Sequence, residues 1–152
     1  MRMKLFIIFL FSFSTLLCAS DARFTQEYGY MDSYQEAKSK ALAHNKPMMI
    51  LFVTASCPWC QKLKHQTLKK DDVNIIVHDS FIPVILDKET DDFPQGLTPM
   101  VVPTIVFIEP KNETKFFEII GYKTVGDFLE LSRQARNAFS KLQPWDTFLF
   151  SF

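Results

Sequence analysis

Two cysteines, Cys57 and Cys60, stand three positions apart in the stretch TASCPWCQKLK. Thiols at this spacing can hold a metal ion, form a disulfide that stabilises the fold, or carry out thiol–disulfide exchange. An apolar run, MMILFV, precedes them, and Pro58 is a residue favoured in the first turn of a helix. We therefore expect the pair between the end of a buried strand and the start of a helix.

This position would give the two thiols different chemistry. Unpaired N–H groups at a helix N-terminus, together with the helix dipole, favour a negative charge, so we expect Cys57 to have a larger thiolate fraction than an ordinary cysteine. Cys60, one turn later, is expected to be more buried. Exchange needs one reachable thiolate to form a mixed disulfide and one shielded thiol to resolve it. Cys57 suits the first role and Cys60 the second.

Two other interpretations of the pair are a metal site and a purely structural disulfide. A zinc site needs about four ligands, and the three histidines have no ligand-like spacing to one another: His44, His65 and His78. His65 is five residues beyond Cys60, where we expect a solvated helix position. A structural disulfide across so short a loop would add little stability. We therefore expect no metal and favour redox chemistry.

Pro103 is the second marked feature, because it interrupts the apolar stretch VVPTIVFIEP. A proline inside a strand removes a ladder hydrogen bond and needs a reason. A cis Val102–Pro103 peptide would expose the Val102 backbone N–H and C=O to an extended substrate. On the residues alone, an ordinary trans proline at the first residue of the strand is favoured, because cis is the minority isomer.

The remaining segments supply the elements that must position these residues. We expect helices over 33–45, 58–70, 71–81 and 124–139. We expect strands over 48–53, 81–89, 101–110 and 114–122. The first helix should bury Tyr34, Ala37, Ala41 and Leu42, and the last should bury Phe128, Leu129, Leu131 and Ala135. Helices between strands imply parallel pairing and the short KNE turn implies a hairpin, so the fold class is α/β, with a mixed central sheet and helices on both faces.

The first twenty residues have the organisation of a secretory signal peptide, with a basic start, an apolar stretch and a small-residue exit. A membrane anchor is the alternative, since the apolar stretch falls just short of a full span; a lipid-modified Cys18 ranks below both. Cleavage would leave one domain, residues 21–152, with two cysteines.

The chain has 17 basic and 17 acidic residues; without Arg2 and Lys4 the balance is 15 to 17, which favours no nucleic-acid partner. The aromatic end, LQPWDTFLFSF, would either pack back onto the domain or form an exposed patch.

Together these segments resemble the thioredoxin family over roughly residues 33–138. MMILFVTASCPWC is similar to its central strand and active-site turn, VVPTIVFIEP to its cis-proline strand, and GY at 121–122 to the glycine after its last strand. Within the family, the chain resembles periplasmic thioredoxin-like reductases such as the carboxy-terminal domain of the bacterial membrane reductase DsbD. The combination is more specific than two cysteines alone.

The resemblance implies a thioredoxin fold with Cys57 as nucleophile and Cys60 as resolving cysteine. It also implies that Pro103 is cis, with Val102 contacting the substrate backbone. Pro58 and Trp59 would tune the redox potential, and Trp59 would form part of the docking surface.

Together with the signal-peptide organisation of the first twenty residues, the resemblance implies an exported, periplasmic oxidoreductase without a cofactor. Its partners would be client proteins with disulfides and, as electron donor, a membrane thiol reductase. Reduction is the first hypothesis, and disulfide formation or shuffling is the alternative direction. A non-catalytic binding module on this fold is the alternative from another class.

The chain departs from the family pattern in three places. Leu51 stands six positions before the first cysteine, where many thioredoxins bury an acid that helps to move the proton of the resolving thiol. Another group or water would then do this work, or resolution would be slower. Val101 stands where a glycine is often found, which would narrow the rim of the groove, and the segment DKETDDFPQGLTPM, where partner selectivity would lie, is not a close match.

Overall fold

The computed structural model describes residues 19–143 of the chain. Residues 1–18 of the expected signal peptide (1–20) and residues 144–152 of the aromatic end lie outside the described residues. Within the described part, the helices are α2 (Ala19–Tyr28), α3 (Tyr34–His44), α4 (Pro58–Leu63), α5 (Asp71–Ser80) and α6 (Val125–Leu142). The strands are β1 (Met48–Val53), β2 (Ile82–Asp87), β3 (Thr104–Glu109) and β4 (Thr114–Ile120). A π-helical turn, η1 (Lys64–Leu68), continues α4, and a short 3₁₀ turn, η2 (Gln95–Leu97), lies before β3. No helix of this part is both long and apolar enough to cross a bilayer.

The four strands form one mixed sheet in the order β2-β1-β3-β4. β1 runs parallel to β2, and the connection between them passes through α4, η1 and α5. β3 is antiparallel to both β1 and β4, and β3 and β4 form a hairpin. The predicted mixed sheet, with one helical crossover and one hairpin, is confirmed.

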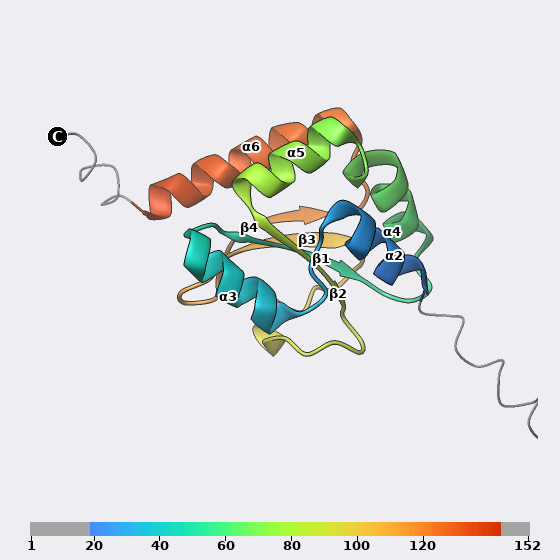
Figure 1. The fold of residues 1–152 in the computed structure, drawn as a ribbon, viewed down its shortest axis with the longest axis horizontal. Coiled ribbons are helices and arrows are strands. Elements are labelled where there is room, and N and C mark those ends of the chain that lie inside the picture. Colours follow the sequence, from blue (N-terminus) through green and yellow to red (C-terminus); the bar gives the residue numbers. More distant parts are fainter. Residues whose placement is uncertain (1–18, 144–152) are drawn as a thin grey trace, which may run out of the picture.

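Helices cover both faces of the sheet, as predicted: α5 and α6 lie side by side over one face and α3 covers the other (Figure 1). Each face of the sheet has its own hydrophobic core, one under α3 and one under α4, α5 and α6. Successive residues of β1 point alternately into these two cores, because neighbouring strand residues face opposite sides of the sheet. Met48, Ile50 and Phe52 pack with α3, whereas Met49, Leu51 and Val53 join the core of α4, α5 and α6. Every residue of β1 and of β3 is buried, which explains the continuous apolar runs.

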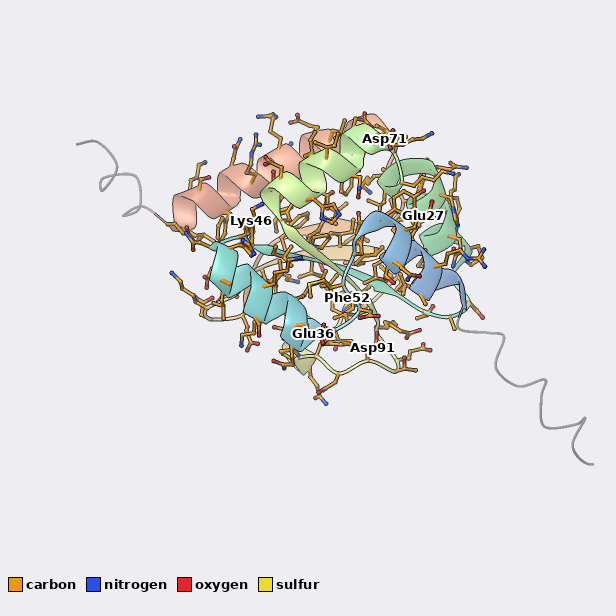
Figure 2. The ribbon with its side chains drawn as sticks, viewed as in Figure 1. Glu27, Glu36, Lys46, Phe52, Asp71 and Asp91 are labelled. Carbon is orange, nitrogen blue, oxygen red and sulfur yellow. A yellow bond between two sulfur atoms is a disulfide. The ribbon has the colours of Figure 1, made fainter. Side chains whose placement is uncertain are left out.

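The contrast between core and surface is clear in Figure 2, where Phe52 lies inside the molecule and Glu27, Glu36 and Asp91 lie at its surface. Phe52 also contacts the Phe93 ring, with the centroids 4.9 Å apart. The loop after β2 therefore closes the end of the α3-side core.

Some details of the predicted helices are wrong. Leu42 is 45% exposed, because it lies on the solvent side of the α3 stripe formed by Tyr34, Ala37 and Ala41. The buried side chains of α6 are Phe128, Ser132, Ala135 and Phe139, whereas Leu129 and Leu131 flank that stripe and are half-buried. α2 was not predicted, because its sequence has few apolar residues; a tertiary contact, the burial of Phe24, holds it against the domain.

Candidate active site

The cysteine pair lies where β1 ends and α4 begins. Cys57 is the N-cap residue of α4 and Pro58 follows in its first turn. The Cys57 carbonyl accepts hydrogen bonds from the N–H groups of Cys60 and Gln61, at 3.1 and 3.2 Å. The Cys57 Sγ lies 3.1 Å from the Cys60 N–H, which points toward it. The sulfur therefore lies among the N–H groups that open the helix, where a negative charge is favoured.

Cys57 and Cys60 form a disulfide, with their Cα atoms 5.2 Å apart. The exposed fraction is 8% for Cys57 and 1% for Cys60. Both residues belong to the core on the α4 side of the sheet. Of the two cysteines, Cys57 is thus the more accessible to a partner. The predicted role of attacking thiol requires this accessibility.

The segment before β3 lies at the same end of the sheet as the cysteines. Thr104 pairs with Phe52 near the end of β1, and the preceding Val102–Pro103 peptide bond is cis. Pro103 therefore precedes β3, and the strand begins three residues later than predicted. The Pro103 carbonyl accepts a hydrogen bond from Gly121 (2.8 Å). Among residues 19–143, no hydrogen-bond partner is found for the Val102 backbone, which leaves it open to pairing.

Trp59 forms part of an aromatic group beside the pair. Its side chain is 56% exposed, and its ring centroid lies 6.1 Å from that of Tyr122. The Lys62 Nζ lies 4.7 Å from the Trp59 centroid and 4.6 Å from the Tyr122 centroid, within cation–π range of both. The Tyr122 hydroxyl donates to Gln66 Oε1 (3.1 Å). These contacts hold the indole at the rim of the site.

Sequence reasoning missed the roles of Lys62 and Tyr122 at this rim, and it missed Lys64 behind it. Lys62 lies in α4 and Tyr122 follows β4, so the two residues are distant in the sequence and come together only in the folded domain. Lys64, by contrast, had a local signal, because it falls on the stripe of α4 and η1 that the core buries. That stripe consists of Cys60, Leu63, Lys64, Thr67 and Leu68.

The three histidines are not brought to the cysteines as a ligand set. His65 is exposed, as predicted, with its ring edge-on to Phe24. The His78 Nε2 lies 2.8 Å from the Tyr28 carbonyl oxygen. In the part of the chain that the structure describes, no three His, Cys, Asp or Glu side chains gather in an arrangement that could hold a metal ion.

These features define a class of protein: an α/β domain with a redox-capable disulfide at a helix N-terminus, next to a cis-proline segment. Over residues 34–136 the chain matches the family model of a thioredoxin-like domain. The chain belongs to this thioredoxin-like family, and the thioredoxin fold is confirmed.

Two relatives show how far the similarity extends. The chain is 31% identical to anterior gradient protein 3 of Xenopus tropicalis over 86 residues, which cover 55% of this chain and 51% of the relative. It is 31% identical to the Mus musculus protein of the same name over 83 residues, 53% of this chain and 49% of the relative. The chain thus spans about half the length of these curated relatives.

Solved structures show the same fold. A thioredoxin from Thermus thermophilus is 26% identical, with a TM-score of 0.56, over 69% of this chain and 85% of that one. The DsbH oxidoreductase is 18% identical, with a TM-score of 0.57, over 70% and 83%. The oxidised carboxy-terminal domain of DsbD from Neisseria meningitidis is 17% identical, with a TM-score of 0.55, over 69% and 98%. At these lower identities, the last two likenesses show the fold alone.

Proposed function

We propose that this protein is an exported thiol–disulfide oxidoreductase that reduces disulfides in client proteins. The observation that carries the proposal is the Cys57–Cys60 disulfide at the start of α4, with the less buried cysteine at the N-cap. Family membership supports the same chemistry. Export is supported by the signal-peptide organisation of residues 1–20.

In the proposed reaction, the reduced protein attacks the client through the Cys57 thiolate. A bond forms between Cys57 Sγ and one client sulfur, and the client disulfide breaks, releasing its second sulfur as a thiolate. The Cys60 thiol then loses its proton and attacks Cys57 Sγ. The mixed disulfide breaks, the client's first sulfur leaves as a thiolate, and the Cys57–Cys60 disulfide forms. The client gains two electrons and the protein loses two, which a membrane thiol reductase restores.

The surface around Cys57 supports client docking. The Val102 backbone, for which no partner is found within residues 19–143, could pair with an extended client segment, and Trp59 presents an exposed ring beside the cysteines. Met100 and Val101 add exposed apolar side chains next to Val102. Trp59 and Pro58, lying between the cysteines, would tune the redox potential.

The first test compares two serine variants in insulin reduction. Cys57→Ser should abolish activity, because it removes the attacking sulfur. Cys60→Ser should also turn over poorly, but it should retain client as a mixed disulfide on Cys57, visible on a non-reducing gel and by mass. Thermal unfolding of both variants and of the fully reduced wild type checks that the fold is kept. If wild type and Cys57→Ser are equally inert, the chain is a binding module and not an oxidoreductase.

The direction of exchange needs a separate measurement. Equilibration with reduced and oxidised glutathione gives the reduction potential of the pair. A reductase should have a potential near that of thioredoxin, roughly −270 mV. A value near the strong oxidants, about −120 mV, would favour disulfide formation and overturn the reductase assignment.

A further inference from the structure

The Lys64 ammonium group lies in an unusual place, one turn beyond the resolving cysteine. Lysine is almost never fully buried in proteins, yet Lys64 is 1% exposed. Its N–H bonds to the Cys60 carbonyl, so the two residues stand at positions i and i+4 of the same helix. Side chains with this spacing lie on one helix face, about 5–6 Å apart at Cβ.

The position of Lys64 on the helix sets the general direction of its side chain. Long side chains on a helix point back toward its N-terminus, over the preceding turn, which for Lys64 is the turn that carries Cys60. The Lys64 Nζ lies 5.9 Å from the centroid of the Phe24 ring. Phe24, Cys57 and Cys60 all belong to the same core cluster. The amine therefore lies beside Phe24, a member of the core cluster that also contains the cysteine pair.

Lys64 lies on the same helix as the resolving cysteine, whereas the other buried charged residue, Glu109, lies far from it. In the described part of the chain, Lys64 and Glu109 are the two buried residues with formally charged side chains. Glu109 ends β3, pairs with Thr114 and bonds to Asn112, at the opposite end of the sheet from the cysteines. Leu51, at the position where many thioredoxins bury an acid, is apolar and wholly buried. Lys64 is thus the buried ionisable side chain on the helix of the resolving thiol.

We propose that Lys64 exchanges a proton with the Cys60 thiol when Cys60 resolves the mixed disulfide; this rests on the proposed function. The neutral Lys64 amine takes the proton from Cys60 Sγ and becomes an ammonium group. The Cys60 thiolate attacks Cys57 Sγ, and the client sulfur leaves with the electron pair of the broken bond. When the disulfide is reduced again, the ammonium returns the proton to Cys60.

The ionisation of Lys64 fits this role. Burial lowers the pKa of Lys64 from 10.5 to about 8, so a useful fraction of the amine is neutral near physiological pH. Tyr30, in the segment after α2, is buried with its ring edge-on to that of Phe24, and this burial raises the pKa of Tyr30. The neighbouring surface pocket between α2 and η1 adds the charged or titratable groups Arg23, Glu27, Tyr28, His65 and Lys69. These side chains border solvent, where their fields are screened.

The test uses Lys64→Met, which keeps an unbranched side chain one heavy atom shorter than lysine and removes the exchangeable proton. The reduced variant is mixed with the aryl disulfide 5,5′-dithiobis(2-nitrobenzoate) and release of the coloured thiolate is followed. The first phase reports attack by Cys57, and the second, concentration-independent phase reports resolution by Cys60. We expect the second phase to slow by about tenfold or more at pH 7, and its pH profile to move up by about one unit. The first phase should change little.

Controls separate this proposal from the proposed function and from misfolding. Lys69→Met, an exposed lysine in the same segment, should match wild type in both phases. Cys60→Ser should show only the first phase; if it shows none, Cys57 is unreactive and the proposed function itself fails. A normal second phase and pH profile in Lys64→Met would overturn the role of Lys64, as would restoration of the rate by Lys64→Arg, which keeps the charge but cannot release a proton.

A second measurement needs no variant. The pKa of Lys64 in the wild-type protein can be followed by NMR of the labelled amine in the disulfide and dithiol forms. A group that shares a proton with Cys60 must titrate differently when that thiol is present, because interacting sites titrate together. An unchanged pKa between the two forms would contradict the proposal.

Discussion

At the scale of single residues, a buried lysine makes stability depend on pH. The folded state lowers the pKa of Lys64 from 10.5 to about 8. Between these values the unfolded chain binds more protons than the folded one, so the free energy of unfolding should rise with pH. Below pH 8 the full cost of burying the charge is present, at most about 3 kcal/mol from a shift of this size.

Lys64→Met should therefore stabilise the disulfide form at pH 7 and flatten its stability curve between about pH 8 and pH 10.5. Urea unfolding of wild type and variant at matched pH measures this difference. The comparison also removes the effect of Tyr30, whose raised pKa lowers stability of both proteins above pH 10. Lys69→Met should follow the wild-type curve. Parallel curves for Lys64→Met and wild type would show that the lysine keeps its ordinary pKa.

The cysteines show how much chemistry a short segment can specify. The location of Cys57 at the N-cap and of Cys60 one turn into the helix follows from residues 48–60 alone, and the structure has both as expected. Their roles as nucleophile and resolving thiol stay predictions. The burial of Lys64 could have been inferred from the stripe that starts at Cys60, although lysine is almost never fully buried in proteins.

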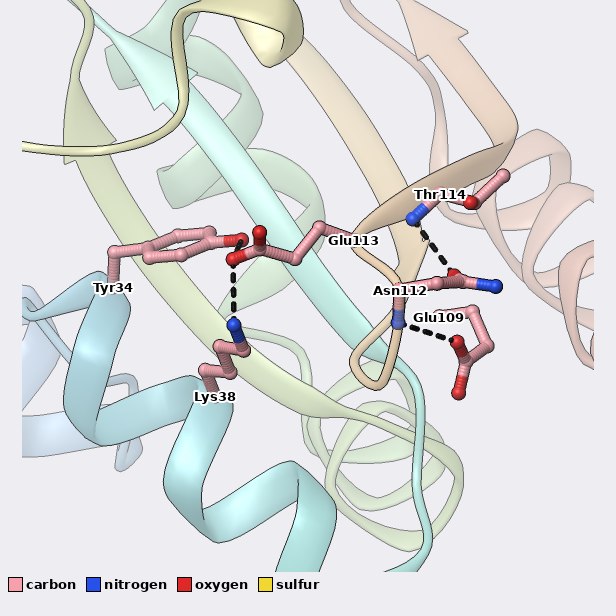
Figure 3. Close-up of polar contacts among 6 residues, drawn as sticks. All are labelled: Tyr34, Lys38, Glu109, Asn112, Glu113 and Thr114. Carbon is pink, nitrogen blue, oxygen red and sulfur yellow. Dashed lines mark hydrogen bonds and ion pairs between the residues drawn. The ribbon is translucent and has the colours of Figure 1, made fainter.

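At the scale of elements, a polar cluster connects α3 to the β3–β4 turn (Figure 3). The Tyr34 hydroxyl and the Lys38 ammonium both donate to Glu113 Oε1, at 2.9 and 2.8 Å. Glu113 has a φ of 58°, and the turn around it is closed by the bond from Thr114 N–H to Asn112 Oδ1. The cluster therefore links the helix on one face of the sheet to the hairpin at its end.

Glu113→Gln should lower the free energy of unfolding at pH 7, by up to about 1 kcal/mol for a partly exposed charge cluster. The bond from Lys38, and then that from Tyr34, lowers the pKa of Glu113. Its stabilisation is present above the ordinary value of 4.5 and is lost as the pH falls through the lowered pKa. Wild type and variant should therefore converge in acid, measured by urea unfolding at pH 7 and pH 3.

A matched control for this cluster is Glu130→Gln, which removes a pair with Arg133 inside α6. That pair joins no two elements, so its loss should change stability less than the loss of the Glu113 carboxylate. An equal change in the two variants would show that the contact between α3 and the hairpin contributes no tertiary stability.

At the scale of the whole molecule, the core on the α4 side depends on aromatic packing around Phe107. This residue is wholly buried in β3, and its ring centroid lies 4.9 Å from that of Phe81 and 5.9 Å from that of Phe117. Phe107→Ala should destabilise the protein by about 3–5 kcal/mol, because it leaves a cavity between the sheet and the helices. Ile75→Ala, at an exposed position of α5, should change stability by less than about 0.5 kcal/mol. Thermal and urea unfolding of the two variants checks the contrast, and similar losses would argue against this core.

Some features of the fold follow from local pattern and others do not. The apolar run of β1, the α3 start at Ser33 and the KNE hairpin turn are visible in neighbouring residues, and the structure has each of them. α2 was missed, because its main stabilising contact, the burial of Phe24, comes from residues far along the chain. The exposure of Leu42 likewise depends on where α3 meets the sheet.

By itself, the sequence determined that two thiols stand at a strand-to-helix junction in an α/β domain, because hydrophobic period, proline position and cysteine spacing are properties of a few adjacent residues. Only the tertiary structure decided that Tyr122 borders this junction and that Lys64 is buried behind it. Those relations depend on the strand order β2-β1-β3-β4 and on helix packing. They join residues separated by tens of positions, and no local pattern carries that information.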